Sequence, residues 1–519
     1  MAADGAGLVR ELILMNRDHA IRVYPVQPDS INGKSPRILT VMTNAKAARV
    51  TRDEGNRTRF LTLAILVVAT FLFGGASRGD VLSLAVLRPL SAIILVAAIF
   101  LGLRAAWNRQ WQPVAFAAAV VSLTILHLIP LPPSIWQGLP DREVIADAFA
   151  AVGQSLPWLP LSMAPLATWN ALFALMGPMA ALLLALALPD HYLPSLLKIV
   201  LVMGVISALL GLLQTIGPMY GPLYFYRITN NGTAVGLFSN RNHQAMLLAT
   251  LFPMFAAFAA MAEGRSDRVR LQRVLAVATG AFLVPLMLVT GSRAGLLLGI
   301  VGLIACFWIY RPAMPEKTTR ALAVSKRSMV MFLAGGIAVL TLMTVLAARA
   351  PAFQRLVNLD AAQDMRFRAL PVIWDAARAY FPYGSGIGGF AEVYAVWEPS
   401  RLLSPNYLNH AHNDVLEIAM VGGLPAILLM LVAILFGAMA VWRLVRARLA
   451  AGRSTLDARD RAIILGRAGM VGLLILAIGS IADYPLRAPS LAVVLMIYVA
   501  FVVAGWQAAG TAPRSRPQL

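Results

Sequence analysis

Apolar runs of about 20 residues recur along almost the whole of this 519-residue chain, and they constrain its fold more than any other feature. A helix of that length crosses a hydrocarbon layer of about 30 Å. Inside lipid, every backbone N–H and C=O group must be paired within the protein, so such runs become helices. A transmembrane β-barrel would show alternating segments of about 10 residues, which this sequence lacks. The chain is therefore predicted to be an all-α, polytopic membrane protein.

Twelve membrane-spanning helices are predicted, and an even number places both termini on one side of the membrane. The short loops on one side carry 18 Lys and Arg residues, whereas those on the other side carry 6. The positive-inside rule therefore places both termini in the cytoplasm. The predicted spans are residues 60–75, 81–103, 112–131, 166–188, 199–216, 243–262, 274–290, 294–310, 330–347, 415–441, 464–482 and 490–508.

Composition supports a membrane environment and argues against several other classes of protein. Only 13% of the residues are charged and the mean hydropathy is +0.72, whereas a soluble domain carries roughly 25% charged residues. The net charge of +20 comes from Lys and Arg placed between apolar runs, which is typical of topology determinants, so membrane lipids rather than nucleic acid are the expected partners. Cys306 is the only cysteine, which excludes disulfides and thiolate metal sites.

The spans divide the chain into a transmembrane domain and flanking segments. No cleavable signal peptide is expected, because the first apolar run starts only at Phe60. A short helix is expected over Leu8 to Ile21, followed by irregular chain. The predicted parts are a cytoplasmic extension at 1–59, the transmembrane domain at 60–508 with two larger outer segments at 132–165 and 348–411, and a cytoplasmic tail at 509–519.

The most unusual polar stretch is Asn409-His410-Ala411-His412-Asn413-Asp414, directly before a long apolar run. Asn413 or Asp414 is well placed to cap the following helix, and Glu417 lies where a capping box would need it. Capping does not explain two histidines at the membrane boundary, where imidazole can exchange a proton near neutral pH. A general base, a metal site and polar filler remain open, although nothing nearby completes a tetrahedral metal site.

Arginines lie at the outer ends of several predicted spans. Arg241 follows Ser239-Asn240, Arg293 lies in Gly291-Ser292-Arg293-Ala294-Gly295, and Arg487 follows Asp483-Tyr484-Pro485-Leu486. Arginine at membrane depth is normally paired or functional, and its planar fork binds phosphate oxygens in pairs. These arginines suggest a clamp for an anionic head group such as a diphosphate. The alternatives are snorkelling to lipid phosphates and, for Arg487, pairing with Asp483.

The large outer segment contains a second basic motif. Arg366 and Arg368 lie in a predicted amphipathic helix near 364–380, which precedes the glycine-rich run Gly384 to Gly389. The run does not follow a strand, so a dinucleotide-binding site is excluded. The two arginines either extend the anion clamp or pair with Asp360 and Asp364.

These motifs together resemble the O-antigen ligase and O-antigen polymerase superfamily. The resemblance rests on Ser292-Arg293-Ala294-Gly295 at a helix start, on Arg366-x-Arg368 before the glycine-rich turn, and on the His410 to Asp414 stretch before Gly422-Gly423. It runs from about Phe238 to Leu435, and the twelve spans with a large outer loop before the tenth agree with it.

The resemblance implies a bacterial inner-membrane glycosyltransferase that works on the periplasmic face. Such enzymes move a glycan from an undecaprenyl-diphosphate carrier to a lipid A core sugar, to another carrier-linked glycan or to a protein hydroxyl. Diphosphate binding then falls on Arg241, Arg293 and Arg366 or Arg368, and the acceptor contact falls on His412, with His410 as the alternative. Arg487, Asn413 and Asp414 are further substrate-binding candidates.

Physical chemistry is consistent with that implied role. Guanidinium groups can stabilise a departing diphosphate without a metal, and an imidazole can take the proton of an acceptor hydroxyl. A metal-independent, inverting displacement with no cofactor is therefore expected. The main rival is a polytopic transporter or flippase of a polysaccharide precursor, although transporters usually place polar sites on broken helices near the membrane midplane. The sequence leaves the sugar, the acceptor and the oligomeric state open.

Overall fold

The computed structural model describes residues 12–15, 21–24, 36–310, 361–403, 407–447, 449 and 456–511. The span expected at 330–347 lies outside these residues, as does the stretch 348–360 of the large outer segment. The chain separates into two compact units, Met1–Thr58 and Arg59–Leu519.

The first unit contains a small antiparallel pair of strands, β1 (Leu12–Met15) and β2 (Ile21–Tyr24). The short helix expected over Leu8 to Ile21 is therefore wrong. Both strands consist mainly of Leu, Ile, Val and Tyr, and β-branched and aromatic side chains fit a pleated strand better than a helix. Helix α1 (Pro36–Phe73) begins on a proline, whose fixed φ suits the first turn.

The described chain contains nine helical segments that are long and apolar enough to cross a membrane. Two shorter apolar helices, α3 (Trp111–Leu126) and α11 (Arg293–Ile309), also lie where spans are predicted. The helical fold class is confirmed, and the number of spans stays a prediction. The nine are Asp53–Phe73 of α1, α2 (Leu84–Arg109), α6 (Pro165–Ala174) with α7 (Met176–Ala187), η2 (Asp190–Tyr192) with α8 (Leu193–Ile216), α9 (Arg241–Ala260), α10 (Ser266–Thr290), α16 (Asp414–Arg446), α17 (Ala458–Ala482) and α18 (Pro489–Ala509).

Two predicted spans differ locally from the helices that form. The span expected at 112–131 ends as a helix at Leu126, and its last residues form strand β3 (Pro130–Leu131). The span expected at 166–188 is divided into α6 and α7 at Leu175. Pro178 lacks the N–H that would bond to the carbonyl of Ala174, which accounts for this break.

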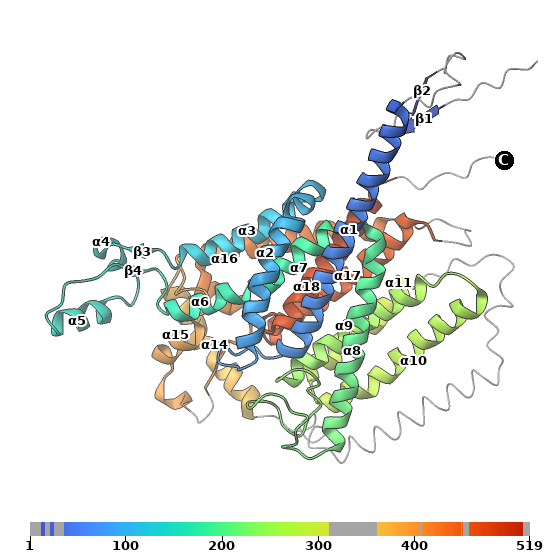
Figure 1. Cartoon of the computed structure of the whole chain (residues 1–519). Helices are drawn as coiled ribbons and strands as arrows, with labels where there is room; N and C mark the ends of the chain where they lie inside the picture. The colour runs from blue at the N-terminus through green and yellow to red at the C-terminus, as the bar shows by residue number, and fades with distance from the viewer. Residues whose placement is uncertain are drawn as a thin grey trace, which may run out of the picture. The chain divides into compact units, whose positions relative to one another are not determined.

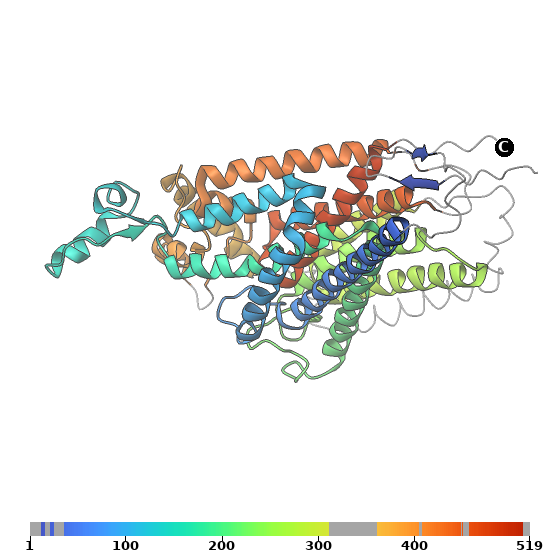
Figure 2. The same cartoon turned by 45° about the horizontal axis from the view of Figure 1, so that its top comes forward.

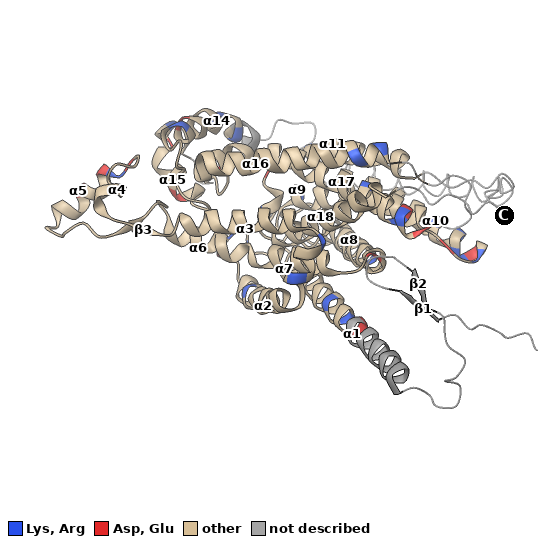
Figure 3. Ribbon diagram, turned by 90° about the horizontal axis from the view of Figure 1, so that it is seen from above, with Lys and Arg blue, Asp and Glu red and all other residues tan. Residues whose placement is uncertain are grey.

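Helix α9 is the centre of the second unit, and α16 lies at its periphery. Within its most apolar window α9 is 89% buried, and it packs against α8, α10, α11 and α17 (Figure 1). The corresponding window of α16 is only 11% buried, and Figure 2 shows α16 running beside α3. Figure 3 shows long stretches of the helices without charge, with Lys, Arg, Asp and Glu in short bands on α1, α2, α10 and α14 and near α4. This distribution suits helices that are surrounded by lipid.

Shorter elements fill the segments expected outside the membrane. Residues 132–165 contain α4 (Pro133–Trp136), α5 (Glu143–Ala151) and strand β4 (Leu159–Pro160), which pairs with β3. Residues after 360 form α14 (Ala361–Ala379), α15 (Phe390–Trp397) and η4 (Ser400–Leu402), and η5 (Pro485–Arg487) links α17 to α18. Asp141 joins the two segments, because its carboxylate accepts hydrogen bonds from Tyr380 Oη at 2.5 Å and Trp397 Nε1 at 3.2 Å.

Helix α16 is broken at Gly423, and the segment around the glycine-rich run pairs the backbone groups that the break leaves open. Gly423 has φ 59° and ψ −154°, which interrupts the helical hydrogen bonds around it. The amides of Ser385 and Gly386 donate to the carbonyls of Met420 and Val421, at 3.0 and 2.9 Å, and Leu424 N donates to the Pro382 carbonyl. Backbone groups left open by the break are thus paired within the protein, as lipid requires. The two glycine motifs, Gly422-Gly423 and the run from Gly384 to Gly389, thus meet in one hydrogen-bonded backbone contact, which we call the glycine joint.

Gly423→Ala should strongly destabilise the protein. Its φ and ψ are almost unique to glycine, and a Cβ there would lie 2.2 Å from the Pro382 carbonyl oxygen, so a loss of at least about 2 kcal/mol is expected. The measurement is the midpoint of thermal unfolding of the purified protein in detergent. Gly437→Ala on the same helix is the control, because a Cβ there meets nothing within 4 Å. Equal midpoints for the two variants would contradict the claim that the glycine joint requires glycine at position 423.

Candidate active site

His412 and Asp483 form the centre of the candidate site. His412 Nδ1 lies 3.1 Å from Asp483 Oδ1, and a carboxylate can only accept, so the imidazole donates this hydrogen bond. Nε2 is then the nitrogen left with a lone pair. His412 has a φ of 50°, and such left-handed backbone is strained for a residue with a side chain. Strain of this kind is common where structure holds a functional group in place.

Asp483 is fully buried and is held by three parts of the chain. It follows the last residue of α17, and its Oδ1 also accepts from the amide of Tyr484 at 3.0 Å. Its Oδ2 accepts from Asn242 Nδ2 at 2.6 Å, in the first turn of α9. Asn240 caps that turn by accepting from the Asn242 amide, which fixes the start of α9.

His410 makes a similar contact with a second buried carboxylate. Its Nδ1 lies 3.0 Å from Glu417 Oε1, and Glu417 Oε2 accepts from the Ala411 amide at 2.9 Å. Asn413 caps α16 by accepting from the Leu416 amide, so the predicted cap is confirmed for Asn413 rather than Asp414. The predicted capping box is wrong, because Glu417 lies one position too far along and turns to His410.

Arg487 is placed between two carboxylates of α16. Its side chain lies 3.0 Å from Glu417 Oε1 and 3.4 Å from Asp414 Oδ1. The alternative pairing with Asp483 is wrong, since Asp483 is occupied by His412 and Asn242. Arg487 therefore neutralises the buried start of α16 and ties it to the η5 turn.

Tyr484 lies among three histidines. The centroid of its ring lies 4.5 Å from that of His410, 4.7 Å from that of His412 and 5.3 Å from that of His243. His243 is fully buried, and neither of its ring nitrogens has a hydrogen-bond partner among the described residues. An unsatisfied polar ring inside a protein needs a reason, and here it adjoins the candidate site.

The buried surroundings set the charge states of the pair. Burial lowers the pKa of His412 below its ordinary value of 6.5, while the hydrogen bond to Asp483 acts in the opposite direction. Burial alone would raise the pKa of Asp483, but the hydrogen bond and charge of His412, with the charges of His243 and Arg366, lower it below its usual range. At neutral pH, therefore, His412 is neutral and Asp483 is ionised, which is the state a base requires.

The predicted clamp arginines do not all lie in the same surroundings. Arg241 and Arg293 each occupy the first position of a helix, α9 and α11, and these helices pack together. A Cβ on Gly295 would lie only 2.2 Å from that of Ala245, so the helices approach closely near both arginines. The charge of Arg366 acts on His412 and Asp483, whereas Arg368 is exposed and donates to the Arg401 carbonyl.

Sequence reasoning missed the roles of several site residues. The sequence predicts Asp483 only as a partner for Arg487, and Glu417 only as a cap. It predicts no role for Asn242, His243 and Tyr484, although each adjoins a motif residue. Polar residues at both ends of apolar runs were the available signal, but nothing in the spacing links position 242 to position 483.

Two histidines paired with buried carboxylates at the ends of apolar helices are groups suited to proton transfer in a membrane protein. Residues 278–431 match the family model for O-antigen ligase, which confirms the resemblance. The matched segment includes Arg293, Arg366 and both histidines, and it excludes Asn242 and Asp483. No curated protein matches the chain significantly. The match covers less than a third of the chain, so the chain is similar to this family over that segment, and its long apolar helices are those of a multi-pass membrane protein.

The sequence leaves metal binding open for the histidine stretch. Among the residues that the structure describes, no group of three or more His, Cys, Asp and Glu is arranged to hold a metal ion. Metal independence of the reaction stays a prediction.

Arg487→Gln should destabilise the protein, because the buried carboxylates of Asp414 and Glu417 would lose the cation that pairs with them. Breaking a buried pair on one side costs about 3 kcal/mol or more. The measurement is the unfolding midpoint in detergent, with Arg487→Lys as the charge-preserving control. An unchanged midpoint for Arg487→Gln would mean that Arg487 does not support this structure.

Proposed function

We propose that this protein transfers a glycan from an undecaprenyl-diphosphate carrier to an acceptor hydroxyl on the periplasmic face of the inner membrane. The observation that carries the proposal is the hydrogen bond between His412 and the fully buried Asp483, which Asn242, the residue after Arg241, also binds. The family's use of lipid-linked glycan donors and glycan acceptors supports the choice of substrates.

His412 acts as the general base. Its Nε2 takes the proton of the acceptor hydroxyl while the oxygen attacks the anomeric carbon of the donor. Asp483 holds the imidazole in the tautomer that leaves Nε2 unprotonated and stabilises the imidazolium that forms, and it does not itself take the proton. Asn242 and the Tyr484 amide keep the carboxylate in place.

His412 is favoured over His410 because their carboxylates differ. Glu417 shares its Oε1 between His410 and Arg487, so much of its charge is already neutralised. Asp483 binds His412, Asn242 and a backbone amide among the described contacts. Asp483 can therefore stabilise an imidazolium more strongly than Glu417 can.

The arginines bind the leaving group. As the bond between the anomeric carbon and the phosphate oxygen breaks, charge develops on the diphosphate. Arg241 and Arg293 stand at adjoining helix starts, where the helix dipoles also favour an anion, and Arg366 adds a third positive charge. Arg368 is a further candidate contact. A single displacement of this kind inverts the anomeric configuration and needs no metal.

The topology follows from the charge asymmetry of the loops. Both termini are proposed to lie in the cytoplasm, which places the histidine stretch on the periplasmic side. The acceptor is a lipid A core sugar, a second carrier-linked glycan or a protein hydroxyl, and the oligomeric state stays open. The break in α16 at Gly423 is a feature that transporters share, so the test must separate transfer from transport.

Purified protein in liposomes, with a lipid-diphosphate-linked glycan and an acceptor, should form a new glycosidic product. His412→Ala should lose about 10²–10⁴-fold in transfer rate, and His410→Ala should lose much less. Expression and unfolding midpoints are matched beforehand. Equal, near-normal rates in both variants would contradict the general base, and movement of the donor across the bilayer without a product would support a transporter instead.

A further inference from the structure

An exposed aromatic residue, Tyr407, precedes the histidine stretch in the sequence. Tyr407 is 58% exposed, whereas Leu408 directly after it is only 5% exposed. His412, the proposed base, follows five residues after Tyr407, a reach of about 18 Å at most along the chain. An aromatic ring thus lies on the surface within the span of a short oligosaccharide from the proposed base.

One face of the Tyr407 ring is supported by an arginine from a distant segment. The guanidinium carbon of Arg78, on the connection between α1 and α2, lies 5.6 Å from the ring centroid. Arg78 is itself held by two hydrogen bonds to Asp80, at 2.9 and 2.8 Å. A guanidinium fixed by a two-point contact keeps its plane, so the ring is braced rather than free to turn.

A braced, exposed ring is suited to bind a flat apolar surface. Pyranose rings present such a surface through their C–H groups and stack on aromatic side chains. Asp80 and Arg78 beside the ring offer an acceptor and donors for sugar hydroxyls, and Asp80 is 55% exposed as a side chain. The hydrogen bond from Arg78 lowers the pKa of Asp80, so the carboxylate is ionised at neutral pH and accepts hydrogen bonds.

We infer that Tyr407, braced by Arg78 and Asp80, is a stacking platform for a sugar residue of the transferred or the receiving glycan, a few sugar residues at most from the bond that forms. The inference rests on the proposed transferase function and assigns a part of its substrate binding. It makes Tyr407 a determinant of which glycan, and of what length, reaches the histidines.

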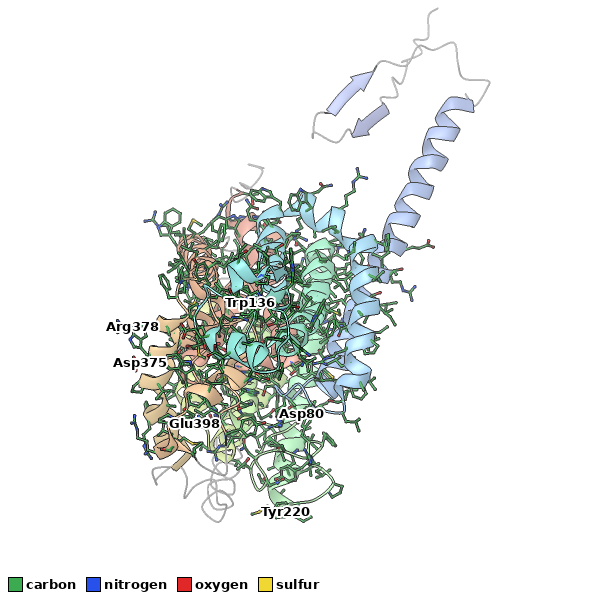
Figure 4. The ribbon with its side chains drawn as sticks, turned by 90° about the vertical axis from the view of Figure 1, so that its left-hand side faces the viewer. Asp80, Trp136, Tyr220, Asp375, Arg378 and Glu398 are labelled. Carbon is green, nitrogen blue, oxygen red and sulfur yellow. The ribbon has the colours of Figure 1, made fainter. Side chains whose placement is uncertain are left out.

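A purely structural role for Tyr407 would not require its ring to be exposed. A tyrosine that only fastened its loop to Arg78 would be expected to bury its ring against the protein. Here Tyr407 remains 58% exposed although Arg78 lies over its ring. Tyr220, which is 82% exposed, lies in the connection between α8 and α9 and has no cation or aromatic ring stacked against it among the described contacts. Figure 4 shows Asp80 and Tyr220 at separate places on the surface.

The test is direct binding of oligosaccharides of one, two and three repeat units, released from the surface polysaccharide of the producing strain. Binding to the full-length protein in detergent is measured by calorimetry, which needs no transfer reaction. Tyr407→Ala should weaken binding of the longer oligosaccharides about tenfold, whereas Tyr407→Trp keeps it. Tyr220→Ala is the matched control and should bind as the unchanged protein does.

Kinetics in liposomes separate the two sources of the sugar. Tyr407→Ala should raise KM about tenfold for either the lipid-linked donor or the acceptor, with kcat nearly unchanged, and the substrate affected identifies the stacked glycan. Binding and KM equal to those of the unchanged protein, or an equal loss in Tyr220→Ala, would overturn the inference. Tyr407-dependent binding in a protein that forms no glycosidic product would support the platform while refuting the transferase.

Discussion

The negative charge of a fully buried carboxylate must be compensated by hydrogen bonds and positive charge from neighbouring groups. The groups that compensate Asp483 bring distant segments of this protein together. The groups that hold it come from the end of α17, the first turn of α9 and the stretch before α16. These segments are separated by up to 241 residues in sequence. Because the buried charge of Asp483 needs contacts from all three segments, it fixes their relative positions. The same contacts orient the imidazole of His412.

The groups around Asp483 and His412 support this arrangement. The break at Gly423 lets the first part of α16 leave the line of the span, and the run from Ser385 to Gly386 pairs the freed carbonyls. Arg487 neutralises Asp414 and Glu417, so the start of α16 can be buried next to His410. Lipid forbids unpaired backbone groups and isolated charges, and the polar groups of this region are held together for that reason.

The sequence predicts the helices well because hydropathy is a local property, whereas the site depends on contacts between distant segments. The apolar runs, the helix at 364–380 and the cap at Asn413 could all be read locally. The pairing of His412 with Asp483 could not, since residue spacing carries no information across 71 positions and two helices. The same holds for the Arg487 pairing, where the nearest carboxylate in sequence, Asp483, is taken by another partner. The broken helix was also missed, because Gly422-Gly423 within an apolar run is compatible with a continuous span.

The pH dependence of transfer by the unchanged protein and by Asp483→Asn tests the account most directly. A base works in its neutral form, so the rate should stay constant above the pKa of His412 and fall as the pH drops through it. Burial lowers that pKa, which places the fall below pH 6.5. Asp483 raises the pKa, so Asp483→Asn should move the fall to still lower pH and also reduce the plateau rate. Identical profiles for both proteins, with equal plateau rates, would contradict the central role of the His412–Asp483 pair.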